Sequence, residues 1–192
     1  AAPMDGRIYE MEMNRASAEK RITSIPLEAG IPVFAVFDIG MNDTMPVLFI
    51  QVVGKEIRII DTYCSHRESV RHYGDVLKGW MTDNKVQDLR VLLPHDGGRK
   101  SMESGKTLVE VFHEMGFSNV QHVPKIPSVW TGINFVRDTF PFMWFNKTKC
   151  VKEHRRGNVK FPSFLQCLEN YHQAEARTGV RQAMEPVHDR YS

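Results

Sequence analysis

Two aspartates lie just beyond apolar segments, where their carboxylates could hold metal ions. Asp38 directly follows the apolar segment 32–37, and Asp96 follows the apolar segment 89–93. Residues just past the carboxyl ends of neighbouring strands line a common crevice, so the two carboxylates converge if these segments are adjacent strands. Converging carboxylates repel each other unless a cation lies between them, and hard oxygen ligands suit magnesium or manganese. Such ions clamp the attacking and leaving oxygens of a phosphodiester.

A simpler interpretation of the same residues remains open at this point. Glycines follow closely after Asp38 and Asp96, and an aspartate followed by glycine is a common turn pair. From the spacing alone, turn formation accounts for both aspartates better than metal binding does. Asp43, in the loop after Asp38, is by itself a turn residue before Thr44.

The Ser-Gly-Lys-Thr sequence at 104–107 resembles the end of a nucleotide-binding loop. The full pattern requires a glycine five residues before Gly105, and Lys100 occupies that position. We therefore predict that this chain does not hydrolyse ATP. The loop would instead carry Arg99, Lys100 and Lys106 near the aspartates, where they could contact phosphates.

Cysteine and histidine pairs form a second candidate metal site. Cys150 with His154, and Cys167 with His172, have tolerable spacing for two halves of a zinc site. Neither half contains a Cys-x-x-Cys knuckle, and Cys167 lies in an apolar pattern that favours a core cysteine. We favour the core interpretation.

Basic residues are concentrated between 147 and 160. A run of charge is usually a solvated face, but in a nuclease it would supply sequence-independent contacts with DNA phosphates. The candidate DNA-binding residues in this segment are Lys147, Lys149, Lys152, Arg155 and Arg156.

The pattern of apolar residues predicts an α/β fold. Segments 32–37, 46–53 and 57–60 read as three strands joined by short turns, hence as antiparallel neighbours. A helix follows from Ser65, then a strand at 89–93, a helix from 108 that ends near Gly116, and a strand at 119–123. Further helices are expected around 133–140 and 164–171. This order predicts a mixed sheet of five or more strands with helices packed against it.

Composition and length are those of one ordinary globular domain. The 192 residues are 42% hydrophobic and 25% charged, and the net charge of +2 permits nucleic-acid binding without requiring it. The 3 cysteines are too few and too sparse for a disulfide framework, which indicates a reducing compartment. No apolar run reaches the ~20 residues of a membrane span. We expect a lead-in segment over residues 1–30, with 1–3 resembling a cloning remnant, and one domain over residues 31–192.

Several of these motifs, taken in order, resemble the nuclease domain of the large terminase subunits of tailed bacteriophages. Phe37-Asp38-Ile39-Gly40 with Asp43-Thr44 resembles the family's first-strand motif, and Leu93-Pro94-His95-Asp96 resembles its second acidic motif. Each motif is short, but the ordered set covers most of the chain from about Pro32 onward. The other matching segments are 51–54, 59–61, 104–107, 132–137, 144–145, 149–150 and 186–189.

The resemblance implies a ribonuclease H-like fold with helices on both faces of the sheet. It also implies a viral endodeoxyribonuclease that cuts concatemeric double-stranded DNA with two Mg²⁺ or Mn²⁺ ions, in the host cytoplasm. Asp38 and Asp96 become the expected metal ligands, and Asp43 a further candidate. In the full assembly, the portal and the small terminase subunit are the expected protein partners. We expect the domain alone to be a monomer that does not bind membranes.

Two departures from the family pattern matter. The family's ATPase half is absent from this chain. Its third acidic residue is expected a few residues beyond a stretch that corresponds here to 188–192, which leaves Asp189 as a weaker candidate ligand. Two alternatives therefore stay open: a DNA-binding or docking module of the packaging motor with little activity alone, and a resolvase-like or transposase-like recombinase of the same fold.

Overall fold

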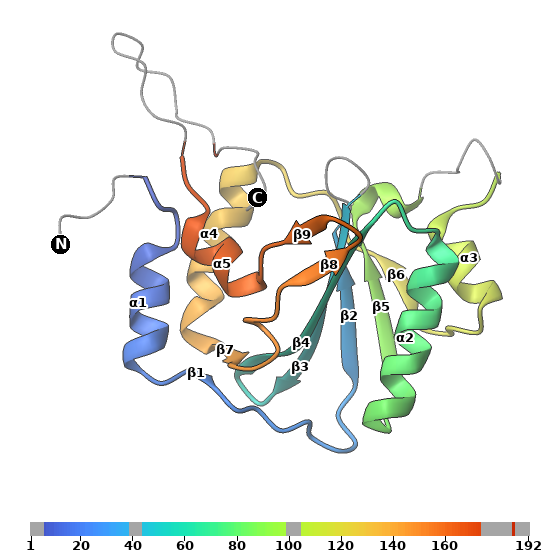
Figure 1. Ribbon diagram of the computed structural model, residues 1–192, viewed down its shortest axis with the longest axis horizontal. Coiled ribbons are helices and arrows are strands. Elements are labelled where there is room, and N and C mark those ends of the chain that lie inside the picture. Colours follow the sequence, from blue (N-terminus) through green and yellow to red (C-terminus); the bar gives the residue numbers. More distant parts are fainter. Residues whose placement is uncertain (1–5, 39–43, 99–104, 174–185, 187–192) are drawn as a thin grey trace, which may run out of the picture.

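The computed structural model describes residues 6–38, 44–98, 105–173 and 186. Within these residues, seven strands form one mixed sheet and two more form a separate hairpin (Figure 1). The order across the sheet is β1-β7-β4-β3-β2-β5-β6. The strands are β1 (Ile22–Thr23), β2 (Val33–Phe37), β3 (Thr44–Val53), β4 (Glu56–His66), β5 (Leu89–Leu93), β6 (Val120–His122) and β7 (Met143–Asn146). A mixed sheet of this kind confirms the predicted fold class.

The centre of the sheet is the antiparallel meander that the sequence predicts. β2 pairs with β3, and β3 pairs with β4, both antiparallel. β2 follows the alternating rule of strands, because Val33, Ala35 and Phe37 are buried and the residues between them are only partly buried. β5 then pairs with β2 in parallel, and β6 pairs with β5 in parallel. The predicted strands at 32–37 and 89–93 are therefore neighbours.

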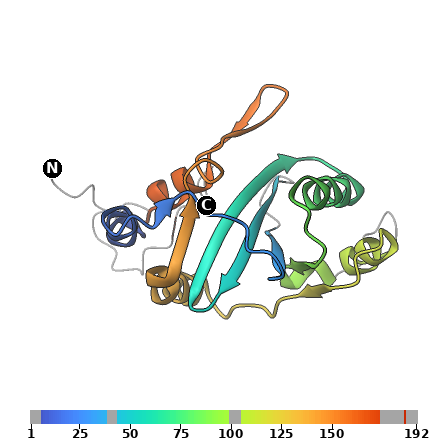
Figure 2. The same ribbon diagram turned by 90° about the horizontal axis from the view of Figure 1, so that it is seen from below.

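Helices cover both faces of the sheet, as expected. On one face α2 (Val70–Asn84) and α3 (Leu108–Glu114) pack on the central strands, where Phe37 and Phe112 lie with ring centroids 5.4 Å apart. On the other face lie α1 (Glu10–Ala18), α4 (Val129–Thr139) and α5 (Phe164–Asn170), which share a core with Ile59 and Phe145. Figure 2 shows the two groups of helices separated by the sheet. Burying each large apolar side chain in these cores stabilises the fold by roughly 1.5–3 kcal/mol.

The predicted start of α2 at Ser65 is wrong. Ser65 and His66 continue β4, where they pair with Met45 and Thr44 of β3. The helix begins after Ser69, whose side-chain oxygen accepts a hydrogen bond from the backbone N–H of His72. Ser69 thereby satisfies one of the free N–H groups of the first turn, which makes it the N-cap.

Three strands beyond the lead-in segment were not predicted. β7 (Met143–Asn146) pairs with β4 in parallel, and the sequence analysis included part of it only as the matching segment 144–145. β8 (His154–Arg156) and β9 (Val159–Phe161) form an antiparallel hairpin inside the basic segment, which projects away from the sheet in Figure 2. Within the predicted lead-in, α1 packs into the second core and β1 extends the sheet beside β7.

Candidate active site

The two predicted metal ligands follow adjacent strands that point the same way. β2 and β5 are parallel neighbours with Val36 opposite Leu92. Asp38 comes directly after β2, and Asp96 lies in the 3-10 turn η2 (His95–Gly98) that follows β5. Both aspartates therefore occupy the same edge of the sheet, which lies at the top of Figure 1. This adjacency is the condition on which the metal hypothesis depended.

Local backbone contacts fix both positions. The backbone N–H of Asp38 donates to the carbonyl oxygen of Pro46 at 3.2 Å, and the Asp38 residue is exposed. In η2 the N–H of Gly97 donates to the carbonyl oxygen of Pro94 at 2.9 Å. A Cβ atom at position 97 would lie 3.0 Å from the Cβ of Leu93, so glycine lets the turn close against the strand. The structure describes the backbone of Asp96 but not its side chain.

An apolar cavity of about 260 Å³ adjoins Asp38 on the face that carries α5. Asp38 supplies the carboxylate in its lining, and Leu48, Phe164, Leu168 and Tyr171 are among the apolar or aromatic residues around it. Asp38 is thus an exposed residue at the border of a largely nonpolar cavity. Coulombic interactions are stronger beside such a cavity than in bulk water.

The other predicted loop residues are only partly within the described structure. Asp43, Arg99, Lys100 and Asp189 lie outside the described residues. Lys106 is described, and its Nζ forms an ion pair with Glu114 at 2.5 Å on the side of α3. Thr107 caps α3 with a capping box, so this part of the sequence serves a helix start.

The basic segment divides into two groups. Lys149 forms an ion pair with Asp61 at 3.4 Å, and Arg156 forms one with Glu68 at 2.8 Å. Lys147, Lys152 and Arg155 are exposed and form no ion pair within the described part of the chain. Because paired cations are already compensated, the last three are the residues of this segment best placed to receive phosphates.

Solved structures of phage terminases have a similar fold. The large terminase of a thermophilic bacteriophage matches over 96% of this chain and 42% of its own, with a TM-score of 0.67 and 11% identity. The nuclease domain of the P22 large terminase matches over 88% of this chain and 80% of its own, with a TM-score of 0.58 and 19% identity. The chain has the fold of a large terminase nuclease domain. The resemblance inferred from the ordered motifs is confirmed at the level of fold.

Further comparisons show how much of each chain the similarity covers. The nuclease domain of the SPP1 large terminase, solved with bound Mn, matches over 82% of this chain and 83% of its own, with a TM-score of 0.53 and 17% identity. This chain spans about two fifths of the thermophilic phage's large terminase, since 42% of that chain is matched. The sequence matches no family model and no curated protein. None of the helices in the described ranges is long and apolar enough to cross a membrane.

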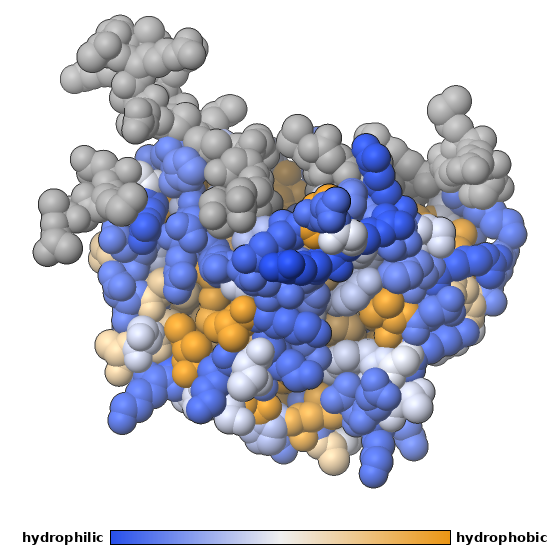
Figure 3. Space-filling view, in the orientation of Figure 1, coloured by the Kyte–Doolittle hydropathy of each residue, from blue (hydrophilic) through white to orange (hydrophobic). Residues whose placement is uncertain are grey.

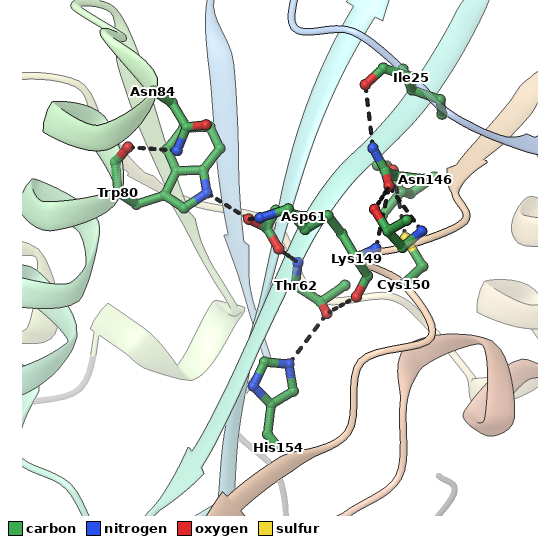
Figure 4. Close-up of polar contacts among 11 residues, drawn as sticks. Ile25, Asp61, Thr62, Trp80, Asn84, Asn146, Lys149, Cys150 and His154 are labelled. Carbon is green, nitrogen blue, oxygen red and sulfur yellow. Dashed lines mark hydrogen bonds and ion pairs between the residues drawn. The ribbon is translucent and has the colours of Figure 1, made fainter.

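A polar network that sequence analysis missed fastens the base of the β8–β9 hairpin to the sheet of this terminase-like fold (Figure 4). Asp61 accepts a hydrogen bond from Trp80 Nε1 at 2.9 Å and pairs with Lys149. Next to it on β4, Thr62 Oγ1 donates to the carbonyl oxygen of Lys149 at 3.2 Å and lies 3.3 Å from His154 Nε2. An acidic residue inside an otherwise apolar strand segment is the signal by which Asp61 could have been found.

The same contacts argue against the zinc alternative. His154 is engaged with Thr62, and the Cys150 thiol donates to the carbonyl oxygen of Ile59 at 3.5 Å. Burial raises the pKa of the Cys150 thiol to about 12, which disfavours the thiolate that zinc requires. Among the described residues, no three histidine, cysteine or acidic side chains are grouped to hold a metal. Both cysteine–histidine pairs are thus better explained by packing.

We expect His154 to make stability depend on pH. Burial lowers the pKa of His154 below 6.5, nearby Lys152 lowers it further, and Asp61 opposes them. The neutral ring is therefore favoured on folding, so its contribution is complete above the unfolded pKa and is lost as pH falls through the folded pKa. Thermal melts should show the wild type losing more stability than His154→Gln between about pH 7 and about pH 5.

A matched control for this measurement is His122→Gln, since His122 is an exposed histidine on β6. That variant should follow the wild-type pH profile. Parallel profiles for wild type and His154→Gln would show that His154 does not contribute to the acid sensitivity.

Proposed function

We propose that this chain is a metal-dependent endodeoxyribonuclease domain of a viral DNA-packaging terminase. The observation that carries the proposal is the placement of Asp38 directly after β2 and of Asp96 in the turn that follows β5, its parallel neighbour. The terminase-nuclease fold supports it, because the motifs that resemble the family's acidic motifs lie at that same edge of the sheet. The substrate is double-stranded DNA, with the portal and the small terminase subunit as partners in the full assembly.

The donor set suits Mg²⁺ or Mn²⁺. Carboxylate oxygens are the ligands that these hard cations prefer, and Asp38 is exposed enough to reach an ion and its water shell. The SPP1 nuclease domain, of similar fold, was solved with bound Mn. We propose that Asp38 and Asp96 hold two such ions, with Asp43 and Asp189 as additional candidate ligands. When bound, the ions would polarise the phosphate and lower the pKa of a coordinated water.

The remaining residues would bind and orient the DNA. Lys147, Lys152 and Arg155 are exposed and offer uncompensated charge to the phosphate backbone. Such contacts carry no base information, so binding should be weak in sequence preference and steep in its dependence on salt. Asp61 and Thr62 act indirectly, since they hold the segment from which these cations project.

A plasmid-nicking assay tests the proposal. Supercoiled plasmid incubated with the purified chain should be nicked in millimolar Mg²⁺ or Mn²⁺, and nicking should stop when EDTA is in excess. Nicked or linear product in excess EDTA would contradict metal dependence. Stable DNA binding without cleavage in either metal would favour the docking-module alternative, and cleavage restricted to branched DNA would favour the recombinase alternative.

A further inference from the structure

Two exposed arginines flank the turn between β4 and α2, and the sequence analysis did not single them out. Arg67 follows β4 directly, and Arg71 is the second residue of α2 after the N-cap Ser69. Both are exposed, and neither forms an ion pair or a side-chain hydrogen bond within the described part of the chain. We call Arg67 and Arg71 the turn arginines.

Both positions are unfavourable for an arginine on grounds of stability. Arg67 has φ 53°, in the left-handed region that residues other than glycine rarely occupy. Arg71 places a cation in the first turn of a 15-residue helix, where the helix dipole is positive, and that turn has no acidic residue. Because the described residues Lys20 and Lys85 share the left-handed conformation, what distinguishes the turn arginines is the cation at the helix N-terminus and the lack of an ion-pair partner for either arginine in the described part of the chain.

The one carboxylate between them is already engaged. Glu68 pairs with Arg156 Nε at 2.8 Å, and Arg156 Nη1 also donates to the carbonyl oxygen of His66. The Glu68 carboxylate also lies 3.9 Å from His72 Nδ1. Glu68 is therefore compensated by Arg156, which leaves the charge of the turn arginines available to an outside anion.

The same contact brings the hairpin to the turn. Arg156 of β8 is tied to Glu68 of the turn, and its neighbour Arg155, one residue back along the hairpin, is exposed. Figure 3 shows a surface dominated by hydrophilic side chains over the hairpin on this side of the molecule. The turn arginines and Arg155 are therefore exposed cations on two segments that the Arg156–Glu68 ion pair joins.

This surface lies at the edge of the sheet that carries the two aspartates. β4 is antiparallel to β3, and β3 is antiparallel to β2, so β4 and β2 end at the same edge. Two strand spacings, or about 10 Å, separate β4 from β2. Asp38 is level with Cys64 of β4, so Arg67 also lies three residues, or about 10 Å, further along the strand direction. In Figure 1 the start of α2 and the ends of β2 and β5 lie together at the top. A polyanion that crosses Asp38 and Asp96 would meet the turn within about 15 Å.

We propose that the turn arginines, with Arg155, form a phosphate-contact surface that holds the backbone of duplex DNA across the edge of the sheet. This inference rests on the proposed nuclease function and adds the residues that grip its substrate. The turn arginines bind through charge, so each phosphate contact releases counterions and steepens the dependence of affinity on salt.

Fluorescence anisotropy with a labelled duplex of about 30 base pairs, recorded in EDTA to prevent cleavage, tests the surface. The double variant Arg67→Gln/Arg71→Gln should bind at least about tenfold more weakly, and the slope of log affinity against log salt should fall by about 2. The matched control is Lys78→Gln/Lys85→Gln, which removes two exposed cations towards the other end of α2. Its affinity should stay within about twofold of the wild type, because Lys78 and Lys85 lie about 10 Å and about 20 Å along the helix from Arg71, away from the edge that carries the aspartates.

A thermal melt separates binding from folding. Removing a cation from the helix N-terminus should leave the Tm of Arg71→Gln unchanged or raise it by about 1–3 °C. Loss of binding together with a lower Tm would assign the turn arginines to the fold and overturn the proposal. An equal loss of binding in the Lys78→Gln/Lys85→Gln control would overturn it too, since any cation on α2 would then serve.

Plasmid nicking by the same wild-type preparation in Mn²⁺ distinguishes the two proposals. Nicking by the wild type, with unchanged affinity in Arg67→Gln/Arg71→Gln, overturns the phosphate-contact surface and leaves the nuclease proposal intact. Binding that depends on the turn arginines, in a wild type that does not nick, supports the surface and overturns the nuclease.

Discussion

Asp38→Asn and Asp96→Asn should each reduce Mn²⁺-dependent plasmid nicking by about 100-fold or more. Asparagine keeps the size of the side chain but removes the negative charge that draws a hard cation. Charge stabilisation by a bound ion is worth several kcal/mol in the transition state, and each 1.36 kcal/mol corresponds to about tenfold in rate. Initial nicking rates at saturating protein measure the effect.

The matched control for these variants is Asp88→Asn. Asp88 is an exposed aspartate just before β5, at the opposite end of the strand that leads to Asp96. Its variant should nick at the wild-type rate, and all three variants should melt within a few degrees of the wild type. Full activity in either Asp38→Asn or Asp96→Asn would remove that residue from the proposed site.

Gln51→Leu should destabilise the fold by about 2–4 kcal/mol. The Gln51 side chain is fully buried on β3 and bonds three backbone groups: it accepts from the N–H of Glu28 and donates to the carbonyl oxygens of Glu28 and Ile31, each at 2.9 Å. Leucine leaves these groups without their partner, and each unsatisfied buried group costs about 1–3 kcal/mol. Water can reach part of residues 28–31, so we expect a loss of unfolding free energy near the lower end of the sum for three unsatisfied groups.

Thermal melting measures this loss as a fall in Tm of about 4–16 °C, at roughly 2–4 °C per kcal/mol for a chain of this size. Val52→Leu is the control, because it introduces the same residue at the next, half-exposed position of β3. We expect its Tm to stay near that of the wild type. A Tm for Gln51→Leu equal to that of Val52→Leu would mean that water or a rearranged loop replaces the three hydrogen bonds.

The Gln51 and Asp38 predictions concern two ends of the same short stretch of chain. Gln51 anchors residues 28–31, which lead into β2, and Asp38 lies at the other end of that strand. A variant at Gln51 that remains folded should therefore retain metal-dependent nicking. The hydrogen bonds of Gln51 lie before the start of β2, and the proposed metal ligand Asp38 lies after its end. The Tm of the Gln51 variant and the nicking rate of the Asp38 variant can therefore be interpreted independently.

Local pattern in the sequence determined the central elements of the fold. Apolar runs at 32–37, 46–53 and 89–93 bounded by glycine and proline predicted β2, β3 and β5, because strand patterning and turn residues act over a few neighbours. The same local reasoning placed Asp38 and Asp96 after strand ends and Gly116 at the end of α3, where its φ is 93°. The ordered motifs then implied the ribonuclease H-like fold.

Only the tertiary structure decided which of these local features meet. Strand spacing in the sequence does not state which strands are neighbours, so the pairing of β2 with β5 had to be observed. β4 runs on to His66 because β3 offers partners as far as Thr44, a condition that no local pattern around Ser65 contains. Long-range ion pairs likewise separated Lys149 and Arg156 from the exposed cations, since Asp61 and Glu68 are far from them in sequence. Charge is a property of each residue, but its compensation depends on the partners that folding brings within a few ångströms.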